Sequence, residues 1–166
     1  MSLQYRLDHR TVEQFEKDIK ECSTIEKRII DNYCQMLYEQ SGNFPNITNN
    51  GVDNSGNLIT NKVNSNADYL INGVLIEVKF CRKDQKRFHF KTSQLKSYIE
   101  QKAKMLFVNG YETDKPRFII VDPEDMGKWL REKESFIFFP WKKEVIQVSE
   151  NEVNWSDWIW TSPGLE

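Results

Sequence analysis

The sequence predicts an α/β fold (an α+β mixed sheet), in which helices flank a central sheet of parallel and antiparallel strands. Residues 24–39 and 93–106 carry apolar side chains at helical spacing, which predicts two helices. Between them, Asn72-Gly73 separates two stretches with alternating side chains, which is typical of a β-hairpin. Residues 117–121 form a short apolar run of the kind found in buried strands. Elements in this order favour a sheet covered by helices.

The length of 166 residues fits one domain that spans residues 1–166. No apolar run reaches the length of a membrane span and the N-terminus is polar, so we expect a cytoplasmic protein with no membrane partner. Cys22, Cys34 and Cys81 form no close pair, which favours reduced thiols over a disulfide framework or a zinc site. The two histidines stand in separate contexts, which argues against histidine-based catalysis. No motif for a nucleotide cofactor is present.

The N-terminal part of the chain predicts two consecutive helices. Thr11, with Gln14 three residues later, fits a capping box for a helix that runs to about Glu21. Ser23 and Glu26 repeat this signal and start the second helix, which Gly42 ends. Glu26 therefore has two interpretations. It caps the second helix, which we favour, or it projects toward the hairpin as a functional residue.

A segment rich in Asn and Gly, residues 41–65, connects this helix to the hairpin. It predicts short β segments around 44–48 and 58–63, joined by turn residues. The segment is either a ligand-contacting loop or a connector.

The hairpin sets two carboxylates opposite each other. If Asn72-Gly73 forms the turn, Ile71 pairs with Val74, and the same register pairs Asp68 with Glu77. Alternation makes the last pair non-hydrogen-bonded, with Cα atoms roughly 4.5 Å apart. Facing carboxylates repel each other, whereas a divalent cation such as Mg²⁺ would turn the repulsion into ligation. An ordinary solvated hairpin face with scattered charges is the alternative.

The two faces of the hairpin differ in polarity. One face is apolar, so we expect it to be buried, and it carries Ala67, Tyr69, Ile71, Val74, Ile76, Val78 and Phe80. The other face carries Leu70, Leu75 and Lys79 together with the two carboxylates.

A basic stretch follows the hairpin. Residues 79–104 contain nine Lys and Arg residues against two acidic ones, although the whole chain has a net charge of −2. Such segregation of charge is expected for a protein that binds a polyanion. A solvated helix face accounts for Lys96, Lys102 and Lys104, but less well for the cluster from Arg82 to Lys91.

The remaining elements follow from local signals. Thr92 or Ser93 caps the helix 93–106, whose buried side would carry Leu95, Tyr98, Ile99 and Leu106, with Gln94 in its first turn. Pro116 precedes the strand 117–121, and Asp122-Pro123 starts a helix over 124–133 that buries Met126, Trp129 and Leu130. Residues 135–139 predict an apolar strand and residues 144–149 an edge strand. We expect the tryptophan-rich tail 154–163 to dock on its own domain or on a second subunit, with base stacking as a lesser alternative.

Phosphodiester hydrolysis fits this set of residues. Asp68 and Glu77 would hold Mg²⁺, which stabilises charge on a phosphate and lowers the pKa of a bound water. The Val78 carbonyl could complete the coordination. Lys79 would orient or help to deprotonate the attacking water, or it would stabilise the developing negative charge.

Asp68…Glu77-Val78-Lys79, on two strands joined by a turn, resembles the motif of the PD-(D/E)XK nuclease superfamily. The resemblance covers about residues 24–122, and residues 123–166 would be a C-terminal elaboration with a helix, strands and the Trp-rich tail. It implies a restriction-endonuclease-like αβββαβ core, in which the strand 117–121 is the fourth strand. It also implies that Glu26 joins the metal site and that Gln94 contacts it. Ala67 departs from the motif by replacing its proline.

The resemblance implies a Mg²⁺-dependent DNA endonuclease, with Mn²⁺ able to substitute, similar to small Holliday-junction-resolvase-like or homing and phage-type enzymes. We expect a homodimer that acts on duplex or branched DNA. The residues expected to contact the DNA backbone are Arg82, Lys83, Lys86, Arg87, Lys91 and Lys96. The alternatives are a non-catalytic nucleic-acid-binding or assembly module on the same fold and, more weakly, an RNA substrate.

Overall fold

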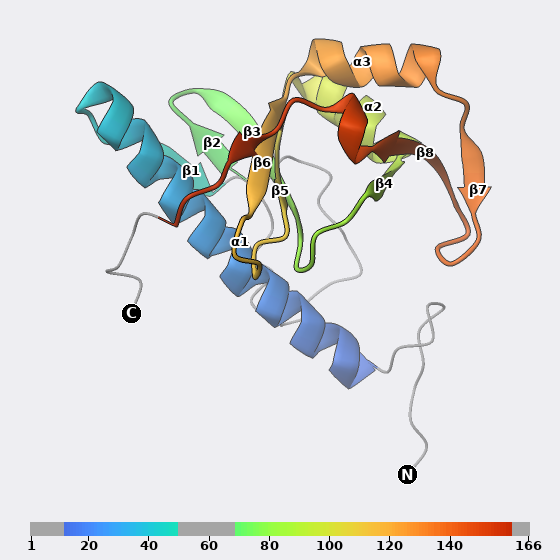
Figure 1. The fold of residues 1–166 in the computed structure, drawn as a ribbon, viewed down its shortest axis with the longest axis horizontal. Coiled ribbons are helices and arrows are strands. Elements are labelled where there is room, and N and C mark those ends of the chain that lie inside the picture. Colours follow the sequence, from blue (N-terminus) through green and yellow to red (C-terminus); the bar gives the residue numbers. More distant parts are fainter. Residues whose placement is uncertain (1–11, 50–68, 161–166) are drawn as a thin grey trace.

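A computed structural model describes residues 12–49 and 69–160 (Figure 1). The helices are α1 (Val12–Ser41), α2 (Thr92–Gln101) and α3 (Pro123–Glu132), with a short 3₁₀ helix at Glu150–Glu152. The strands are β1 (Ile47–Asn49), β2 (Tyr69–Ile71), β3 (Val74–Cys81), β4 (Arg87–Lys91), β5 (Lys104–Asn109), β6 (Arg117–Val121), β7 (Phe136–Phe138), β8 (Lys143–Ser149) and β9 (Ser156–Asp157).

The strands form two sheets. The larger has the order β1-β2-β3-β5-β6-β9, in which β3 and β5 are parallel and the other neighbours are antiparallel. The smaller is antiparallel, with the order β4-β8-β7. The predicted mixed α/β architecture is therefore confirmed. No helix among residues 12–49 and 69–160 combines the length and the apolar composition needed to cross a membrane.

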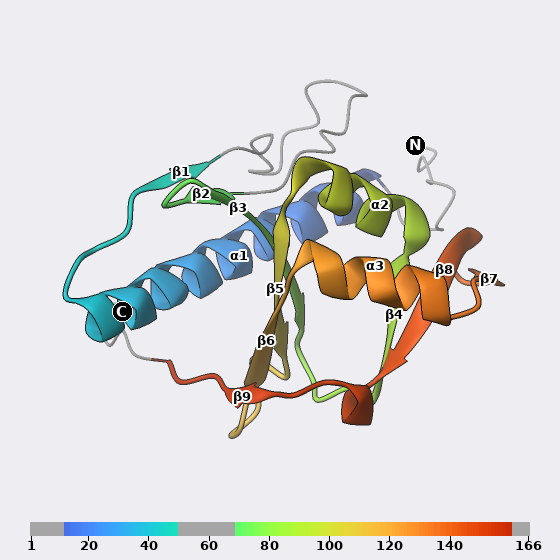
Figure 2. The same ribbon diagram turned by 90° about the horizontal axis from the view of Figure 1, so that it is seen from above.

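Helices cover both faces of the larger sheet. Alternate residues of β5 enter two different cores, because successive side chains of a strand point to opposite faces. Leu106 and Val108 pack with Ile29 and Ile30 of α1, whereas Met105 packs with residues of α2, α3 and the smaller sheet. The helices α2 and α3 lie side by side (Figure 2). The face of β3 opposite α1 is therefore covered rather than open to solvent.

The N-terminal helix is continuous, so the prediction of two helices is wrong. Ser23 lies inside α1, and the capping interpretation of Glu26 is therefore wrong as well. Neither glycine nor proline interrupts the segment, and the Thr24 hydroxyl donates to the carbonyl of Lys20 one turn earlier. The predicted end at Gly42 is confirmed, because Gly42 has a positive φ of 77° and its amide donates to the Tyr38 carbonyl.

The helix predicted over 93–106 ends earlier than expected. Lys102 has a left-handed φ of 58°, and the chain then enters β5, where Leu106 is buried. An apolar run gives the same signal for the last turn of a buried helix and for a buried strand. The strand that follows α2 directly is therefore β5 rather than the segment 117–121. The predicted caps are also wrong, because Lys91 is the N-cap and the Thr92 hydroxyl donates to Glu144 Oε1 on β8.

The C-terminal elements combine confirmed and corrected predictions. Asp122 caps α3 through a bond from the Asp125 amide to its side chain, with Pro123 in the first turn, as predicted. Residues 144–149 belong to β8, which is the central strand of the smaller sheet and not an edge. The tail docks on its own chain, because β9 pairs with β6 and Trp158 is buried.

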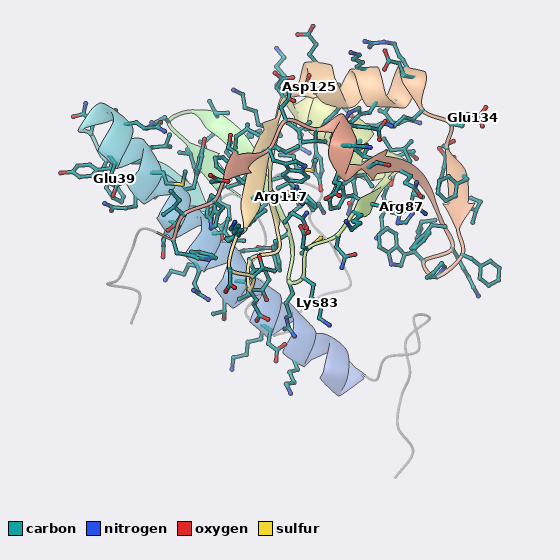
Figure 3. The ribbon with its side chains drawn as sticks, in the orientation of Figure 1. Glu39, Lys83, Arg87, Arg117, Asp125 and Glu134 are labelled. Atoms are coloured by element: carbon teal, nitrogen blue, oxygen red, sulfur yellow. The ribbon has the colours of Figure 1, made fainter. Side chains whose placement is uncertain are left out.

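Arg117 lies on β6, near the centre of the molecule (Figure 3). It ties the segment before β4 to the segment after β8. Its guanidinium donates to Asp84 Oδ1 at 2.6 Å and to Glu150 Oε2 at 3.0 Å, and it lies over the ring of Trp155. Burial alone would lower the pKa of Arg117, but the hydrogen bonds to the two carboxylates outweigh it and raise the pKa. The cation therefore stays charged and holds the two sheets together.

Candidate functional site

The β2–β3 hairpin has the predicted turn and register. Asn72 and Gly73 both have positive φ, 50° and 81°, as a type I′ turn requires. The pairs are Ile71–Val74, Leu70–Leu75 and Tyr69–Ile76. Asp68 and its predicted pairing with Glu77 lie outside the described residues. The register is thus confirmed up to the pair that precedes the predicted carboxylate pair.

The predicted apolar face of the hairpin is partly confirmed: Tyr69 and Phe80 are half-buried, and Ala67 lies outside the described residues. Ile71, Ile76 and Val78 are buried in the core beneath α1, as expected. Val74 is 37% exposed, so its predicted burial is wrong. It directly follows the turn, and its cross-strand partner Ile71 is buried.

Glu77 is a buried carboxylate on the opposite face, with 8% of its surface exposed. The hydroxyl of Tyr98 on α2 donates to Glu77 Oε1 at 3.0 Å. The ammonium nitrogen of Lys79 lies 3.6 Å from the same oxygen. Burial of a carboxylate is costly without such partners, so these contacts stabilise Glu77 in its position.

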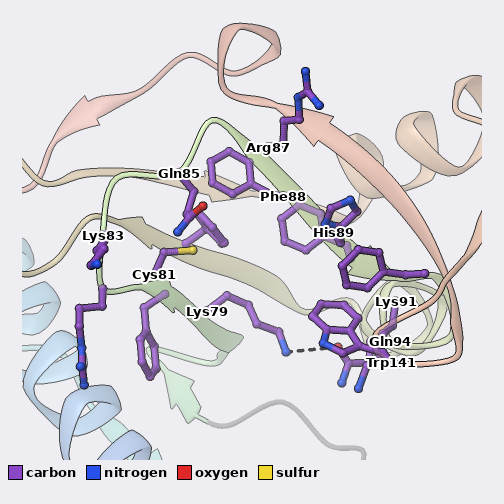
Figure 4. Close-up of a pocket in the computed structure, with 15 residues that line it drawn as sticks. Lys79, Cys81, Lys83, Gln85, Arg87, Phe88, His89, Lys91, Gln94 and Trp141 are labelled. Atoms are coloured by element: carbon purple, nitrogen blue, oxygen red, sulfur yellow. Dashed lines mark hydrogen bonds between the residues drawn. The ribbon is translucent and has the colours of Figure 1, made fainter. Parts of the chain in front are cut away.

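Lys79 connects Glu77 to the start of α2. Its Nζ donates to Gln94 Oε1 at 3.2 Å, which is the dashed bond in Figure 4, and it lies 5.9 Å from the centre of the Tyr98 ring. The side chain is only part exposed, so its ammonium is held in one place by the three neighbours. The structure thus brings together Glu77, Lys79 and Gln94, three of the four residues predicted to be catalytic.

Tyr98 is the member of this cluster whose polar role the sequence does not reveal. Its ring is buried, as the helical pattern predicts, but its hydroxyl reaches the carboxylate of Glu77. Gln94 and Tyr98 are four residues apart, so they share one face of α2. That spacing is the signal that could have identified Tyr98 beside Gln94.

A cavity of about 750 Å³ opens next to Lys79 and Gln94 (Figure 4). Among the described residues that line it, five are cationic and none is acidic. Its apolar wall includes Phe107 and Phe138. The cationic residues come from the end of β3, from the following loop and from β4, and they are Lys79, Arg82, Lys83, Arg87 and Lys91.

Lys91 shows the electrostatic character of this cavity. Burial lowers its pKa, and the positive charges of Lys79 and Lys143 lower it further. Lysines of two other strands, β3 and β8, therefore repel the Lys91 ammonium. Such a cluster favours an anionic ligand, because an anion would relieve that repulsion.

Four of the six residues predicted to contact DNA line the cavity, and two do not. Lys86 extends into solvent and pairs with Glu150 at 3.6 Å. Lys96 is exposed on α2 and is not part of the cavity lining. Lys86 belongs to the loop before β4, and Lys96 lies on an exposed side of α2.

Cys81 also lines the cavity but is not suited to act as a nucleophile. Burial raises the pKa of its thiol to about 11, with a further contribution from the negative charge of Asp84. The reactive form of a cysteine is the thiolate, so this group is protonated and unreactive at neutral pH.

The predicted metal ligands are only partly described. No group of three or more His, Cys, Asp or Glu side chains that could hold a metal occurs within residues 12–49 and 69–160. Glu77 provides one carboxylate, and oxygen ligands of this kind suit Mg²⁺. Glu26 is half-buried on α1, and Val78 lies on β3 with its side chain toward α1. Ligation by Asp68, Glu26 and the Val78 carbonyl stays a prediction.

Comparison of the chain with protein-family models, with curated proteins and with solved structures gives no match in any of the three.

Proposed function

We propose that this protein is a Mg²⁺-dependent DNA endonuclease that hydrolyses phosphodiester bonds at a centre formed by Asp68, Glu77 and Lys79. One observation carries the proposal. The Glu77 carboxylate, the Lys79 ammonium and the Gln94 amide oxygen converge at the border of a cavity with five cationic residues in its wall. An acidic group that can bind a cation thus lies beside a surface that attracts phosphates.

The hairpin register supports a second carboxylate at the centre. One further pair in the same register would set Asp68 opposite Glu77. These carboxylates, with the Val78 carbonyl and Glu26, would hold the metal through hard oxygen ligands. Mg²⁺, or Mn²⁺ in its place, would neutralise charge on the phosphate and lower the pKa of a water molecule.

The described side chains have distinct roles in this proposal. Tyr98 holds the Glu77 carboxylate in place through its hydroxyl. Gln94 orients Lys79, whose ammonium would donate to a phosphate oxygen and stabilise the negative charge that develops there. Arg82, Lys83, Arg87 and Lys91 would hold the neighbouring phosphates of the strand.

The order of the elements supports the PD-(D/E)XK resemblance as part of the proposal. The strand predicted near residues 58–63 lies outside the described residues. With β1 in its place, an αβββαβ core would consist of α1, β1, β2, β3, α2 and β5. The parallel pair β3 and β5 is joined through β4, which belongs to the smaller sheet, and α2. Lys79 and Gln94 lie on β3 and α2. A homodimer that cuts both strands of duplex or branched DNA belongs to the same proposal.

A cleavage assay tests the proposed activity. Supercoiled and branched DNA are incubated with the protein in Mg²⁺, in Mn²⁺ or in EDTA. We expect cutting with either metal and none in EDTA. Asp68→Asn and Lys79→Met should each lower the rate by about a hundredfold or more, because groups that stabilise transition-state charge contribute that much.

Lys86→Met is the matched control, because Lys86 carries the same charge but points away from the cavity into solvent. It should cut at nearly the wild-type rate. Metal-independent cutting, or full activity of Asp68→Asn, would contradict the proposed centre.

The basic cavity also favours a second candidate, a nucleic-acid-binding module without catalysis, since its five cations would serve binding alone equally well. Tight DNA binding with no cutting of any substrate would support this candidate. Cutting of RNA but not DNA would assign the centre to a ribonuclease.

A further inference from the structure

The two faces of the smaller sheet carry different groups of aromatic side chains. Phe88 and Phe90 of β4 are buried against Phe107. The other face of the same sheet carries an aromatic cluster that lines the cavity. We call this cluster the aromatic wall, and it consists of His89 of β4, Phe138 of β7 and Trp141 of the β7–β8 turn.

The rings of the aromatic wall are ordered against one another. His89 stacks on Phe138 with ring centres 4.1 Å apart and planes 21° apart. Trp141 contacts Phe138 edge-on, with ring centres at 4.8 Å. His89 Nε2 lies 3.2 Å from Gln147 Oε1 on β8, which restrains the imidazole. The wall is therefore a preformed surface rather than a set of independent side chains.

The backbone of the β7–β8 turn positions Trp141. The amides of Trp141 and Lys142 both donate to the Phe138 carbonyl, at 3.1 and 2.8 Å. Lys142 has a φ of 54°, a left-handed conformation that is unfavourable for a residue with a side chain. Pro140 restricts the turn further. A turn built in this way keeps the indole at the cavity instead of burying it.

Much of this aromatic surface is open. Trp141 is 45% exposed, and Phe139 at the tip of the turn is 82% exposed. Large aromatic side chains exposed together mark a surface that binds something. The Lys91 ammonium lies 5.5 Å from the centre of the Trp141 ring, and Lys143 lies close enough to lower the pKa of Lys91. Whatever binds here should therefore combine flat apolar groups with negative charge.

We propose that the aromatic wall stacks the unpaired nucleobases of a single-stranded DNA segment, while Lys91 and Lys143 contact its phosphates. This inference rests on the proposed nuclease function and names the substrate class, which is DNA with unpaired bases next to the phosphodiester that is cut. The faces of bases inside a duplex are already stacked, so only unpaired bases can use an aromatic platform. A second copy of the chain is disfavoured because it would bring two lysine clusters together.

Binding of two oligonucleotides in EDTA tests this inference. One is oligothymidine of about 20 nucleotides, and the other is an abasic strand of the same length and charge. Wild-type protein should bind oligothymidine at least about fivefold more tightly, because each base stacked on an aromatic ring contributes that factor or more. Trp141→Ala should lose most of this preference and keep its affinity for the abasic strand, and Trp141→Phe should retain part of it.

Ile137→Ala is the matched control. Ile137 is 63% exposed on the same strand as Phe138, but it faces away from the wall, opposite Glu144. It should bind both strands as the wild type does. Equal wild-type affinities for the two strands would overturn the inference. A Trp141→Ala variant that loses affinity for the two strands equally would also overturn it. The same holds if the only change in this variant is the loss of a dimer, measured by analytical ultracentrifugation.

These outcomes are separate from those of the cleavage assay, because EDTA prevents metal-dependent cutting. A base-dependent loss of binding in Trp141→Ala without any nuclease activity would overturn the proposed catalysis and leave the stacking surface intact. Metal-dependent cutting with equal binding of the two strands would overturn the stacking surface alone.

Discussion

At the scale of single residues, Tyr98 connects the packing of α2 to the chemistry proposed for Glu77. Its ring is part of the apolar core, and its hydroxyl donates to a carboxylate that is almost entirely buried. A buried acceptor that loses its donor is left with an uncompensated cost of desolvation. Tyr98 is therefore a positioning residue, which acts on the reaction through Glu77.

Tyr98→Phe tests this role while it preserves the buried ring. We expect the rate of metal-dependent cleavage to fall by about tenfold, and the free energy of unfolding to fall by about 1–2 kcal/mol, because one hydrogen bond to a charged group is lost. The metal concentration needed for half-maximal cleavage should rise, since Glu77 is less well oriented. DNA affinity in EDTA should not change.

Tyr38→Phe removes a hydroxyl from an exposed tyrosine of α1 and is the matched control. Its cleavage rate and metal requirement should equal those of the wild type. A Tyr98→Phe variant with lower stability but an unchanged metal requirement would restrict Tyr98 to a structural role.

At the scale of elements, α1 shows how a local start signal can be overridden. Ser23 and Glu26 have the spacing of a capping box, yet the helix continues through them. The stripe formed by Ile25, Ile29 and Ile30 packs against the sheet, so interrupting the helix would sacrifice buried apolar contacts. Tertiary packing therefore decides between two arrangements that the local sequence permits.

The position of Ser23 predicts the sign of a stability change. If Ser23 were an N-cap, Ser23→Ala would destabilise the protein by about 1 kcal/mol. Inside a helix the same change should stabilise it by a few tenths of a kcal/mol, because alanine is the better helix former. Urea unfolding of Ser23→Ala and of the wild type distinguishes the two cases. A clear loss of stability would contradict a continuous α1.

At the scale of the whole molecule, the two sheets meet at the cavity. The larger sheet contributes Lys79 to its lining and the smaller contributes Lys91. Burial lowers the pKa of Lys91, and the positive charges of Lys79 and of Lys143 on β8 lower it further. The free protein thus carries an electrostatic cost that a bound polyanion would remove, so stability and binding oppose each other at this place.

Lys91→Met should raise the midpoint of thermal unfolding of the DNA-free protein and weaken DNA binding. The stabilisation should stay below about 1 kcal/mol, because Lys91 is partly exposed and solvent screens its charge. The folded state of the wild type loses the Lys91 proton below the ordinary pKa of 10.5, whereas the unfolded state holds it up to that value. The free energy of unfolding of the wild type should therefore rise relative to that of Lys91→Met as the pH approaches 10.5. The extra stability of Lys91→Met over the wild type should shrink accordingly.

Unfolding measured from neutral pH to about 10.5, at low and high salt, checks this expectation. Lys96→Met is the control, because Lys96 is exposed on α2 outside the cavity. If the gain in stability of Lys91→Met over the wild type grew with pH, the result would contradict repulsion of the Lys91 ammonium by its lysine neighbours.

Local signals with a strict backbone requirement were predictable from the sequence. Asn72-Gly73 formed the expected turn because both residues tolerate positive φ, and that turn determined the register of the hairpin. Gly42 ended α1, and Asp122 capped α3, for similar local reasons. Lys79 and Gln94 could be proposed as neighbours only through a resemblance, since 14 residues separate them along the chain.

The mixed α/β class, the hairpin register and the excess of positive charge after β3 could be predicted from the amino-acid sequence, because each depends on composition or on residues near one another in the chain. Folding in three dimensions was needed to establish that α1 is continuous, that residues 104–109 form a strand, and that Tyr98 donates to Glu77. It also decided that the aromatic wall shares a cavity with Lys79. The physical reason is that these outcomes depend on which surfaces bury each other, and apolar patterns leave several partners equally possible.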